Sequence, residues 1–459
     1  MPSFSGQFQI SGGRSGPCGL SFDKDALQIV SGGGPALACD LGDIDVFAPG
    51  DYLLDLTFFT GQQLRLHEFG KAFDNLVHDL LEAYRARLVQ CLLLDDLEEV
   101  SRFTGTAGYQ SAARSFCGPS EIRLYKSNVA FLPTSATGLQ WRLADVDSVR
   151  FDAATYATVL QSRDEQITVT KLAKRTDEFR ERVEAAMQAV GEASAHVLHG
   201  LFPFVAPDRF ANLAAAMKEG HAASLATLKA IDPKTPQAIV STVVDAKLRP
   251  YFNHLAKLAG EAGTFAGFKM IRAEDTGESG EAADEAAAGE AAAAQSTPGT
   301  EPAADGAPDS SDPAAVGGEP AREDVEEQGE AGEQPVLHWF FFRIAPPAAK
   351  EPVLAWEATS RAGRATYLFR ESALTAGSHA TVSPDAVAER LARGLALVNF
   401  RREPVYLPDD SLQMQPKFRR YAIASRRLPD LASLRRAFIG RAIHTTPDTW
   451  RRQLDALLA

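Results

Sequence analysis

Cysteine is scarce in this 459-residue sequence, and a long apolar run is missing. The four cysteines form no CxxC pair and have no clustered histidines beside them, so the sequence contains no recognisable zinc site. We expect reduced thiols, which are typical of a cytoplasmic protein. The N-terminal residues lack the basic and then apolar pattern of a signal peptide, and no run reaches the roughly 18 apolar residues that a spanning helix needs. The sequence therefore predicts a soluble protein of the cytoplasm.

Catalytic motifs are missing as well. There is no GxSxG, no GxxxxGK[ST], no HExxH and no dinucleotide fingerprint after a strand. The glycines at 32–34 are followed by Pro35 and a strand-like run, which indicates a hairpin loop and not a phosphate site. His196 and His199 lie one helical turn apart, but no cysteine or paired acid completes a metal site, so a structural role is favoured. We expect no enzyme, no catalytic residue, no metal and no cofactor.

Charge is distributed unevenly along the chain, whose formal net charge is −13. Residues 273–335 hold 18 acids and one base, whereas residues 336–459 hold 19 bases and 11 acids. The acidic segment has no aromatic residue and almost no branched aliphatics, which predicts a disordered insert. It lies between two strand-like runs, FAGFKMIR and VLHWFFFRI. Two roles stay open for it: a solvating spacer, or a strap that contacts the basic C-terminal region within the chain.

A repeat is present in the first half of the chain. The stretch CDLGDIDVF at 39–47 returns as WRLADVDSV at 141–149, with an offset of 102. The same offset relates the hydrophobic positions upstream, and small drifts occur only where loops could absorb them. The repeated acids, at i and i+2, could hold a divalent metal, but two acids do not complete a site, so strand-end or turn capping is favoured. These acids are Asp43 and Asp45 in the first copy, and Asp145 and Asp147 in the second.

Each copy changes its hydrophobic period near its end. Short alternating segments separated by turn signals give way to helical spacing at about 73–84 in the first copy and 179–190 in the second. The pattern predicts six or seven antiparallel strands closed by one C-terminal helix.

In this order and size of elements, residues 4–91 and 120–193 resemble the pleckstrin-homology superfold. The resemblance implies a barrel or sandwich that serves as a protein-recognition or scaffold module. Phosphoinositide binding does not carry over, because the first hairpin of the first copy has Arg14 alone and the second copy offers only Arg123 and Lys126. The tryptophan common in the closing helix of the family is also missing from both copies.

The second half of the chain has helical and mixed patterns. Thr235 and Pro236 begin one predicted helix, and Pro250 should kink or end it. The run VLHWFFFRI is apolar on both faces, which predicts a central strand, and Gly363 is expected in a hairpin turn. The whole chain is therefore predicted to be α+β and multidomain. The predicted divisions are copy 1 at 1–100, copy 2 at 113–195, a helical connector at 196–262, and an α+β domain at 263–459 with the acidic insert 273–335.

Arginine is concentrated near the C-terminus. Repeated Arg-Arg pairs could grip the phosphates of nucleic acid or of anionic lipid. Acids interrupt them and few aromatics accompany them, which favours a solvated helical face or an internal partner. The candidate polyanion contacts are Arg419, Arg420, Arg426, Arg427, Arg435, Arg436, Arg451 and Arg452.

These patterns favour a non-catalytic binding or scaffold protein that acts through protein–protein recognition by its tandem domains. The alternative is a peripheral binder of anionic membrane or nucleic acid, which uses the arginine-rich region and is gated by the acidic insert. The partner expected under the first hypothesis is a protein.

Overall fold

The structure is a computed structural model. It describes residues 2–112, 114–134, 136–163, 165–271, 335–345, 351–359, 365–376 and 382–459. The predicted hairpin turn at Gly363 and the acidic insert, apart from Pro335, lie outside these ranges. One compact unit comprises Met1–Lys269 and Val336–Ala459. No helix in the described ranges is long and apolar enough to cross a membrane.

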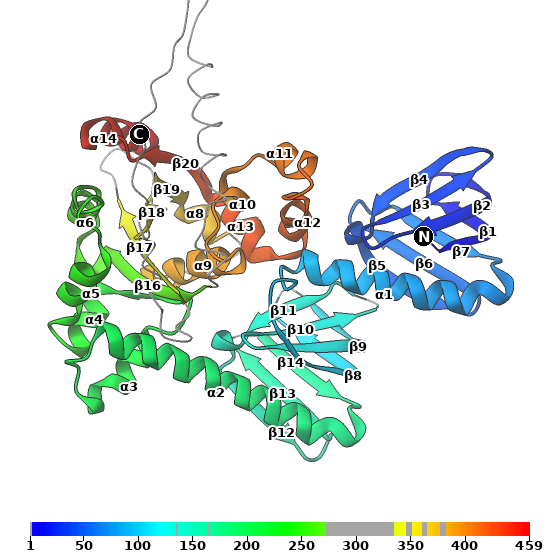
Figure 1. The fold of residues 1–459 in the computed structure, drawn as a ribbon, viewed down its shortest axis with the longest axis horizontal. Coiled ribbons are helices and arrows are strands. Elements are labelled where there is room, and N and C mark those ends of the chain that lie inside the picture. Colours follow the sequence, from blue (N-terminus) through cyan, green and yellow to red (C-terminus); the bar gives the residue numbers. More distant parts are fainter. Residues whose placement is uncertain are drawn as a thin grey trace, which may run out of the picture. The chain divides into compact units, whose positions relative to one another are not determined.

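The first copy forms a seven-stranded antiparallel sheet in the order β4-β3-β2-β1-β7-β6-β5 (Figure 1). Its strands are β1 (Ser3–Ile10), β2 (Arg14–Phe22), β3 (Ala26–Ser31), β4 (Gly34–Asp40), β5 (Ile44–Gly50), β6 (Leu53–Phe58) and β7 (Gln63–His67). A 3₁₀ turn, η1 (Leu41–Asp43), connects β4 to β5, and η2 (Gly70–Ala72) leads into helix α1 (Phe73–Cys91).

The second copy repeats this order strand for strand, as β11-β10-β9-β8-β14-β13-β12. Its strands are β8 (Glu99–Gln110), β9 (Ser115–Tyr125), β10 (Asn128–Pro133), β11 (Leu139–Arg142), β12 (Ser148–Asp152), β13 (Ala157–Ser162) and β14 (Glu165–Thr170). Turn η3 (Leu143–Asp145) takes the place of η1, and η4 (Ala173–Arg175) precedes helix α2 (Thr176–Leu201). The second copy was predicted to begin at residue 113, but its first strand, β8, begins at Glu99. The prediction missed this strand because its threonines and glycines show little hydrophobic alternation.

The two sheets also share their register. Leu20 pairs with Ile29 in the first sheet, and the residues 102 further along, Ile122 and Phe131, pair in the second. All four side chains are fully buried, since alternate residues of each strand face one interior. Two seven-stranded antiparallel sheets, each followed by a helix, are compatible with the pleckstrin-homology-like fold.

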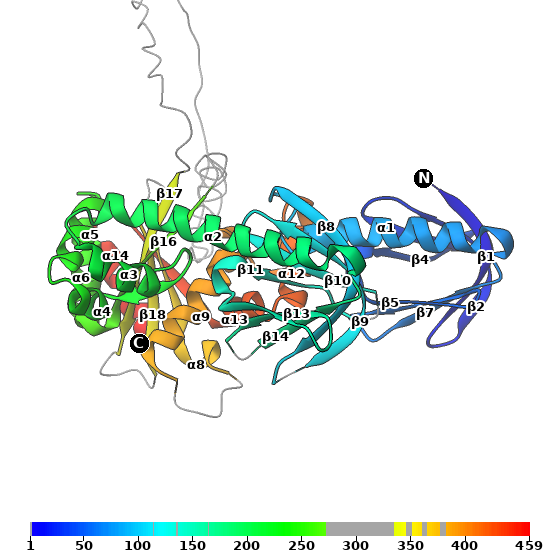
Figure 2. The same cartoon turned by 90° about the horizontal axis from the view of Figure 1, so that it is seen from below.

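Each helix covers its own sheet and then continues beyond it. Phe179 and Val183, near the start of α2, belong to the core of the second copy. Leu198 and Leu201, at its far end, belong to a different core, which the later part of the chain forms. Both views show α2 running from the second sheet to the helices after it (Figures 1 and 2).

The rest of the chain builds a third, six-stranded sheet with helices around it, which confirms a mixed α+β fold. Its order is β15-β16-β17-β18-β19-β20. The strands are β15 (Ala222–Ser224), β16 (Thr264–Met270), β17 (Val336–Ile344), β18 (Val353–Ala358), β19 (Ala365–Arg370) and β20 (Phe438–Ile443). The apolar run at 336–344 is an interior strand, as expected. Strand β15 was not expected in the helical connector, because three residues, AAS, carry no readable pattern.

The helices of this part of the chain are short. Pro250 begins a helix instead of kinking one, because its fixed φ suits a first turn. The connector contains α3 (Pro207–Ala216), α4 (Leu225–Ile231), α5 (Thr235–Val243) and α6 (Arg249–Gly263). The later helices are α8 (Glu371–Leu374), α9 (Pro384–Leu397), α10 (Glu403–Tyr406), α11 (Asp409–Met414), α12 (Arg419–Arg427), α13 (Pro429–Ala437) and α14 (Pro447–Leu458).

Both faces of the third sheet are packed. Phe340 and Phe342 share a core with Phe252 of α6 and Trp450 of α14. On the opposite face, Trp339 meets Phe400 edge to face, with ring centroids 5.0 Å apart. Helices on both sides explain why this sheet reads as apolar throughout.

Gly267 of β16 tests this packing, because a Cβ atom there would lie 1.2 Å from Trp339 Cζ3. We expect Gly267→Ala to lower the free energy of unfolding by about 1–3 kcal/mol or more, as overpacking does. Gly191→Ala is the matched control, since nothing lies within 4 Å of a Cβ atom at that position in α2. It should stabilise by about 0.5–1 kcal/mol. Urea denaturation of both variants checks the pair, and equal effects would contradict the packing of β16 on Trp339.

Candidate functional site

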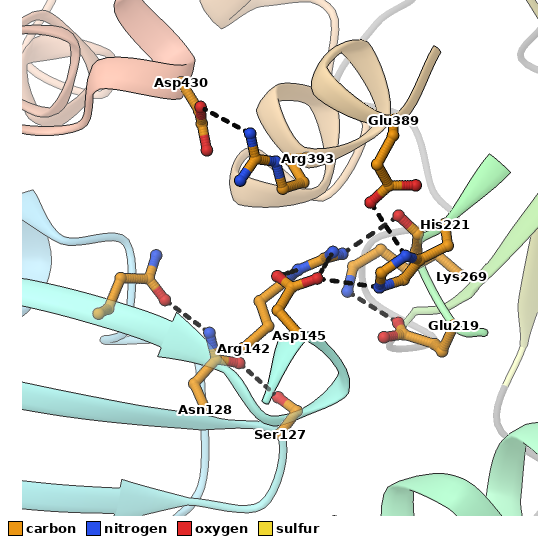
Figure 3. A network of polar contacts seen from close by, with 12 residues as sticks. Ser127, Asn128, Arg142, Asp145, Glu219, His221, Lys269, Glu389, Arg393 and Asp430 are labelled. Atoms are coloured by element: carbon orange, nitrogen blue, oxygen red, sulfur yellow. Dashed lines mark hydrogen bonds and ion pairs between the residues drawn. The ribbon is translucent and has the colours of Figure 1, made fainter. Parts of the chain in front are cut away.

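The described residues contain one cluster with the composition of a functional site, and it lies where three segments meet. Asp145 ends η3 of the second copy, His221 precedes β15, and Glu389 lies on α9. Figure 3 shows His221 between the two carboxylates. We call this cluster, together with Arg142 and Arg163, the histidine joint.

Distances in the histidine joint are those of direct ion pairs. The imidazole Nδ1 lies 2.9 Å from Glu389 Oε1, and Nε2 lies 2.9 Å from Asp145 Oδ1, although the latter contact departs from the direction of a good hydrogen bond. Arg142 donates to both oxygens of Asp145 at 2.8 Å, and Arg163 Nη2 donates to Glu389 at 2.6 Å. The imidazole and both carboxylates are each about 15% exposed, so solvent screens them little.

This geometry sets the protonation of His221. Burial lowers its pKa, but the close contacts with the Asp145 and Glu389 carboxylates raise it, and the net shift is upward from 6.5. For Asp145, burial raises the pKa while Arg142 and His221 lower it, and the pKa ends well below 3.8. For Glu389, burial raises the pKa, but the contact with His221 and the charges of His221, Arg163 and Arg142 lower it, and the net shift is downward from 4.5. The joint therefore favours an imidazolium held between two carboxylates.

A metal ion suits the histidine joint poorly. The two ring nitrogens face different carboxylates, and each carboxylate already pairs with an arginine. A divalent ion here would lie beside two guanidinium groups, and it would need His221 to be neutral. The residues fit a proton better than a metal.

Gly220 is required beside this joint. Its φ is +72°, and a Cβ atom there would lie 2.0 Å from Arg142 Nη1, which donates to the Gly220 carbonyl at 3.4 Å. Glycine therefore permits both the left-handed turn and the close approach of Arg142. His221 also lines a cavity of about 620 Å³, together with Arg163, Arg390 and Arg393.

A second cluster, which we call the arginine joint, connects α12 to the first copy. Arg427 is 2% exposed and donates through Nη2 to the carbonyl oxygens of Gly42 and Ile44, the former at 2.9 Å. Neighbouring Arg426 pairs with Asp43 at 2.6 Å. A Cβ atom at Gly42 would lie 2.7 Å from Cys91 Sγ and 3.0 Å from Ile423 Cδ1, so α12, α1 and η1 meet closely there.

Asp40 anchors the same place from the inside. Its carboxylate accepts two hydrogen bonds from Arg87 of α1, at 2.8 and 2.7 Å, and one from the Gly42 amide at 2.8 Å. Both charged residues are buried, and breaking such a pair leaves an unpaired charge at a cost of about 3–5 kcal/mol. Asp40 therefore joins turn η1 to α1, independently of the contacts that α12 makes with the same turn.

The repeated acids explain what the two joints share. Asp43 and Asp145 occupy equivalent positions, and each pairs with residues outside its own sheet: Arg426 for the first, and His221 for the second. Of the other two acids, Asp147 accepts a hydrogen bond from the backbone amide of Arg163, as expected for turn capping, whereas Asp45 accepts one from the Thr137 hydroxyl. The repeat thus marks the place on each copy where later segments dock.

The eight arginines predicted as polyanion contacts all have partners within the chain. Besides Arg426 and Arg427, Arg420 pairs with Asp95 at 2.8 Å and Arg419 with Asp40 at 3.2 Å. The remaining pairs are Arg435 with Asp409, Arg436 with the Ala432 carbonyl and Ser433, Arg451 with Asp448, and Arg452 with Thr449. An external phosphate would have to displace the contacts of buried Arg427, whereas the exposed contacts of Arg436, Arg451 and Arg452 offer it little competition.

A buried polar group also fastens α14 to the third sheet. Thr366 donates to Glu357 at 2.7 Å and accepts from the Trp450 indole at 3.0 Å. His444 Nε2 lies 3.3 Å from Glu357, which is 1% exposed.

His199, singled out for its spacing, stacks on Phe210 with ring centroids 3.6 Å apart, which is a structural contact.

The histidine joint predicts a pH-dependent stability. Because the pKa of His221 is raised on folding, its contribution is fully present below about pH 6.5 and is lost as pH rises through the folded-state value. The lowered pKa values of Asp145 and Glu389 act in the opposite sense, and their contribution is lost only as pH falls through them. His221→Gln should therefore destabilise by about 1–2 kcal/mol near pH 6, and less near pH 9.

Urea denaturation across this range measures the difference between wild type and His221→Gln. His78→Gln, on the exposed side of α1, is the matched control and should give a constant, small difference. A His221→Gln difference that does not vary with pH would contradict the ionised joint.

The arginine joint predicts that Arg427 matters more than its exposed neighbours. Arg427→Met removes the donors to two backbone carbonyls, so we expect a loss of about 1–3 kcal/mol in the free energy of unfolding. Amide exchange in α12 should become faster as the helix detaches. Arg436→Met, on the exposed side of α13, should change stability by less than about 0.5 kcal/mol. Similar losses in both variants would show that the joint carries no special weight.

No family model and no curated protein matches this chain. Among solved structures, one similar chain is the C-terminal domain of an unknown protein from Leishmania infantum, at 9% identity and a TM-score of 0.19, covering 24% of this chain and 98% of that one. Another is the N-terminally truncated linker and DH/PH domains of p115-RhoGEF, at 10% identity and a TM-score of 0.18, covering 26% of this chain and 45% of that one. These likenesses assign the chain to no family.

Proposed function

We propose that this chain is a non-catalytic scaffold that recognises a protein partner through its tandem pleckstrin-homology-like domains. One observation carries the proposal: a sheet of this kind already binds a helix inside the chain. The end of α1 contacts the second copy through Leu88, Arg85 and the Leu92 carbonyl. The scaffold can therefore use on a partner the kind of contact that it uses internally.

The charged clusters support the same proposal. Both joints connect segments of one compact unit through groups with little exposure to solvent: His221 lies between Asp145 and Glu389, and buried Arg427 donates to the Gly42 carbonyl. Such pairs fix the relative placement of the segments they connect, which gives a partner a preformed surface. The alternative, polyanion binding by the arginine-rich region, receives less support because Arg427 is buried and Arg420 and Arg435 are mostly covered by contacts within the chain.

A pull-down of crosslinked full-length chain from native cell extract tests the proposal directly. Nuclease and detergent controls, with moderate salt, remove nucleic acid and lipid as bridging agents. Proteins that persist through all three treatments favour the scaffold. Recovery that collapses under any of them favours the polyanion alternative.

Removing residues 273–335 separates the two hypotheses more sharply. If the arginine-rich region is a gated polyanion site, deletion of the acidic segment should raise binding to heparin or to anionic vesicles at least about tenfold. Under the scaffold proposal we expect polyanion binding to change little and the proteins recovered by pull-down to stay the same. A replacement insert of the same length, with its acids changed to glutamine or asparagine, controls for chain length.

A further inference from the structure

The two copies differ in whether one matched face of their sheets is covered. In the second sheet this face is formed by β9, β10 and β11, and its residues Glu121, Ala130 and Leu132 are at most 5% exposed. In strands that are otherwise half-buried, burial of the outward positions requires a second covering element.

That covering element is the last part of α1. Arg85 Nη1 lies 3.3 Å from Glu121 Oε2. A Cβ atom at Gly138 would lie 2.9 Å from Leu88 Cδ2, and Gln140 donates to the Leu92 carbonyl at 3.1 Å. An aliphatic side chain and a helix end thus seat on the outer face of the second sheet.

The equivalent face of the first sheet is open. The register match makes Gly19, Gln28, Val30, Ala36 and Ala38 the counterparts of Glu121, Ala130, Leu132, Gly138 and Gln140. Gly19, Gln28 and Ala38 are exposed, and Val30 is 46% exposed, whereas its counterpart Leu132 is 1% exposed. We call this surface the open face.

We infer that the open face binds an amphipathic α-helix of a protein partner, in the manner in which the second sheet binds the end of α1. The inference rests on the proposed scaffold function and names the surface and the partner's chemistry. Small side chains at Gly19, Ala36 and Ala38 allow close approach of a helix, and Val30 offers an aliphatic contact in the place of Leu132.

The residues that differ between the two faces indicate which side chains the bound helix should carry. Glu121, which pairs with Arg85, is replaced by Gly19, so the open face has no acid there to hold an arginine. Gln28 replaces Ala130 and adds one neutral hydrogen-bonding group. The fitting helix therefore has an aliphatic stripe of leucine-like residues flanked by neutral polar residues, and gains little from basic ones.

The test uses the full-length protein and a defined probe, a fluorescent synthetic peptide of residues 77–94 with Cys91→Ser, which contains the last part of α1 and the three residues after it. The probe carries Leu88 and the helix end that contact the second sheet, and the second sheet itself stays occupied by the tethered α1. We expect saturable binding by fluorescence anisotropy with a Kd below about 1 mM. Gln28→Arg and Val30→Arg should each weaken it at least about tenfold, because they place a charge under an apolar stripe.

Gln62→Arg is the matched control, since it adds the same charge at an exposed turn of the first copy and should leave binding unchanged. Hydrogen exchange in β4, the edge strand, distinguishes helix docking from strand addition. A helix on the face should leave β4 amides nearly as exposed as before, whereas an added strand would protect them.

Three results would overturn the inference: no binding up to about 1 mM, equal binding by wild type and both face variants, or strong new protection of β4. Its failure is distinguishable from failure of the scaffold proposal. If Gln28→Arg still recovers the same proteins by pull-down, the scaffold stands and the open face is not its binding surface.

Discussion

A desolvated guanidinium needs acceptors, and at Arg427 this requirement holds two distant parts of the chain together. Its acceptors are the carbonyl oxygens of Gly42 in η1 and of Ile44 at the start of β5, which lie more than 380 residues upstream. If α12 separated from the first copy, water could replace the carbonyl acceptors of Arg427. The close packing of Ile423 against Gly42 would nevertheless be lost. The first copy and the C-terminal part are therefore coupled, and a change that loosens one should be felt in the other.

Helices provide the other connection. The end of α1 lies against the second sheet, and the end of α2 enters the core of the following module. Each closing helix thus packs in its own copy and also against the next part of the chain. This continuous helix, in place of a flexible linker, limits how the two parts can move relative to each other. The arginine joint connects α12 to the first copy, and the histidine joint connects α9 to the second copy. Later segments of the chain are therefore also bound to earlier ones.

Much of the fold follows from short-range pattern in the sequence. Alternation at positions such as Leu20 and Ile29, and helical spacing after Phe73, predict both copies because they reflect one buried side. Strands β8 and β15 escape this reasoning, the first because threonine and glycine blur its alternation and the second because it has three residues.

The joints could not be predicted in the same way. Ion pairs carry no periodicity, and the partners of Asp43 and Asp145 lie on elements whose packing only the fold decides. His221 stands alone in KEGHAAS, with no motif around it. The repeated acids were visible as a pattern, but their role was not, because capping and docking use the same residue type.

Duplication makes the two copies controls for each other. Residues that face the interior keep their character at the offset of 102, since both sheets must cover a similar core. Outward residues are free to diverge, and they do so where one copy is covered and the other is not, as with Glu121 and Gly19. A charged residue under a covering helix must be paired, whereas a small residue on an open face leaves room for whatever docks there. The difference in exposure between matched positions, more than any motif, is the observation from which we infer that the open face is a binding surface.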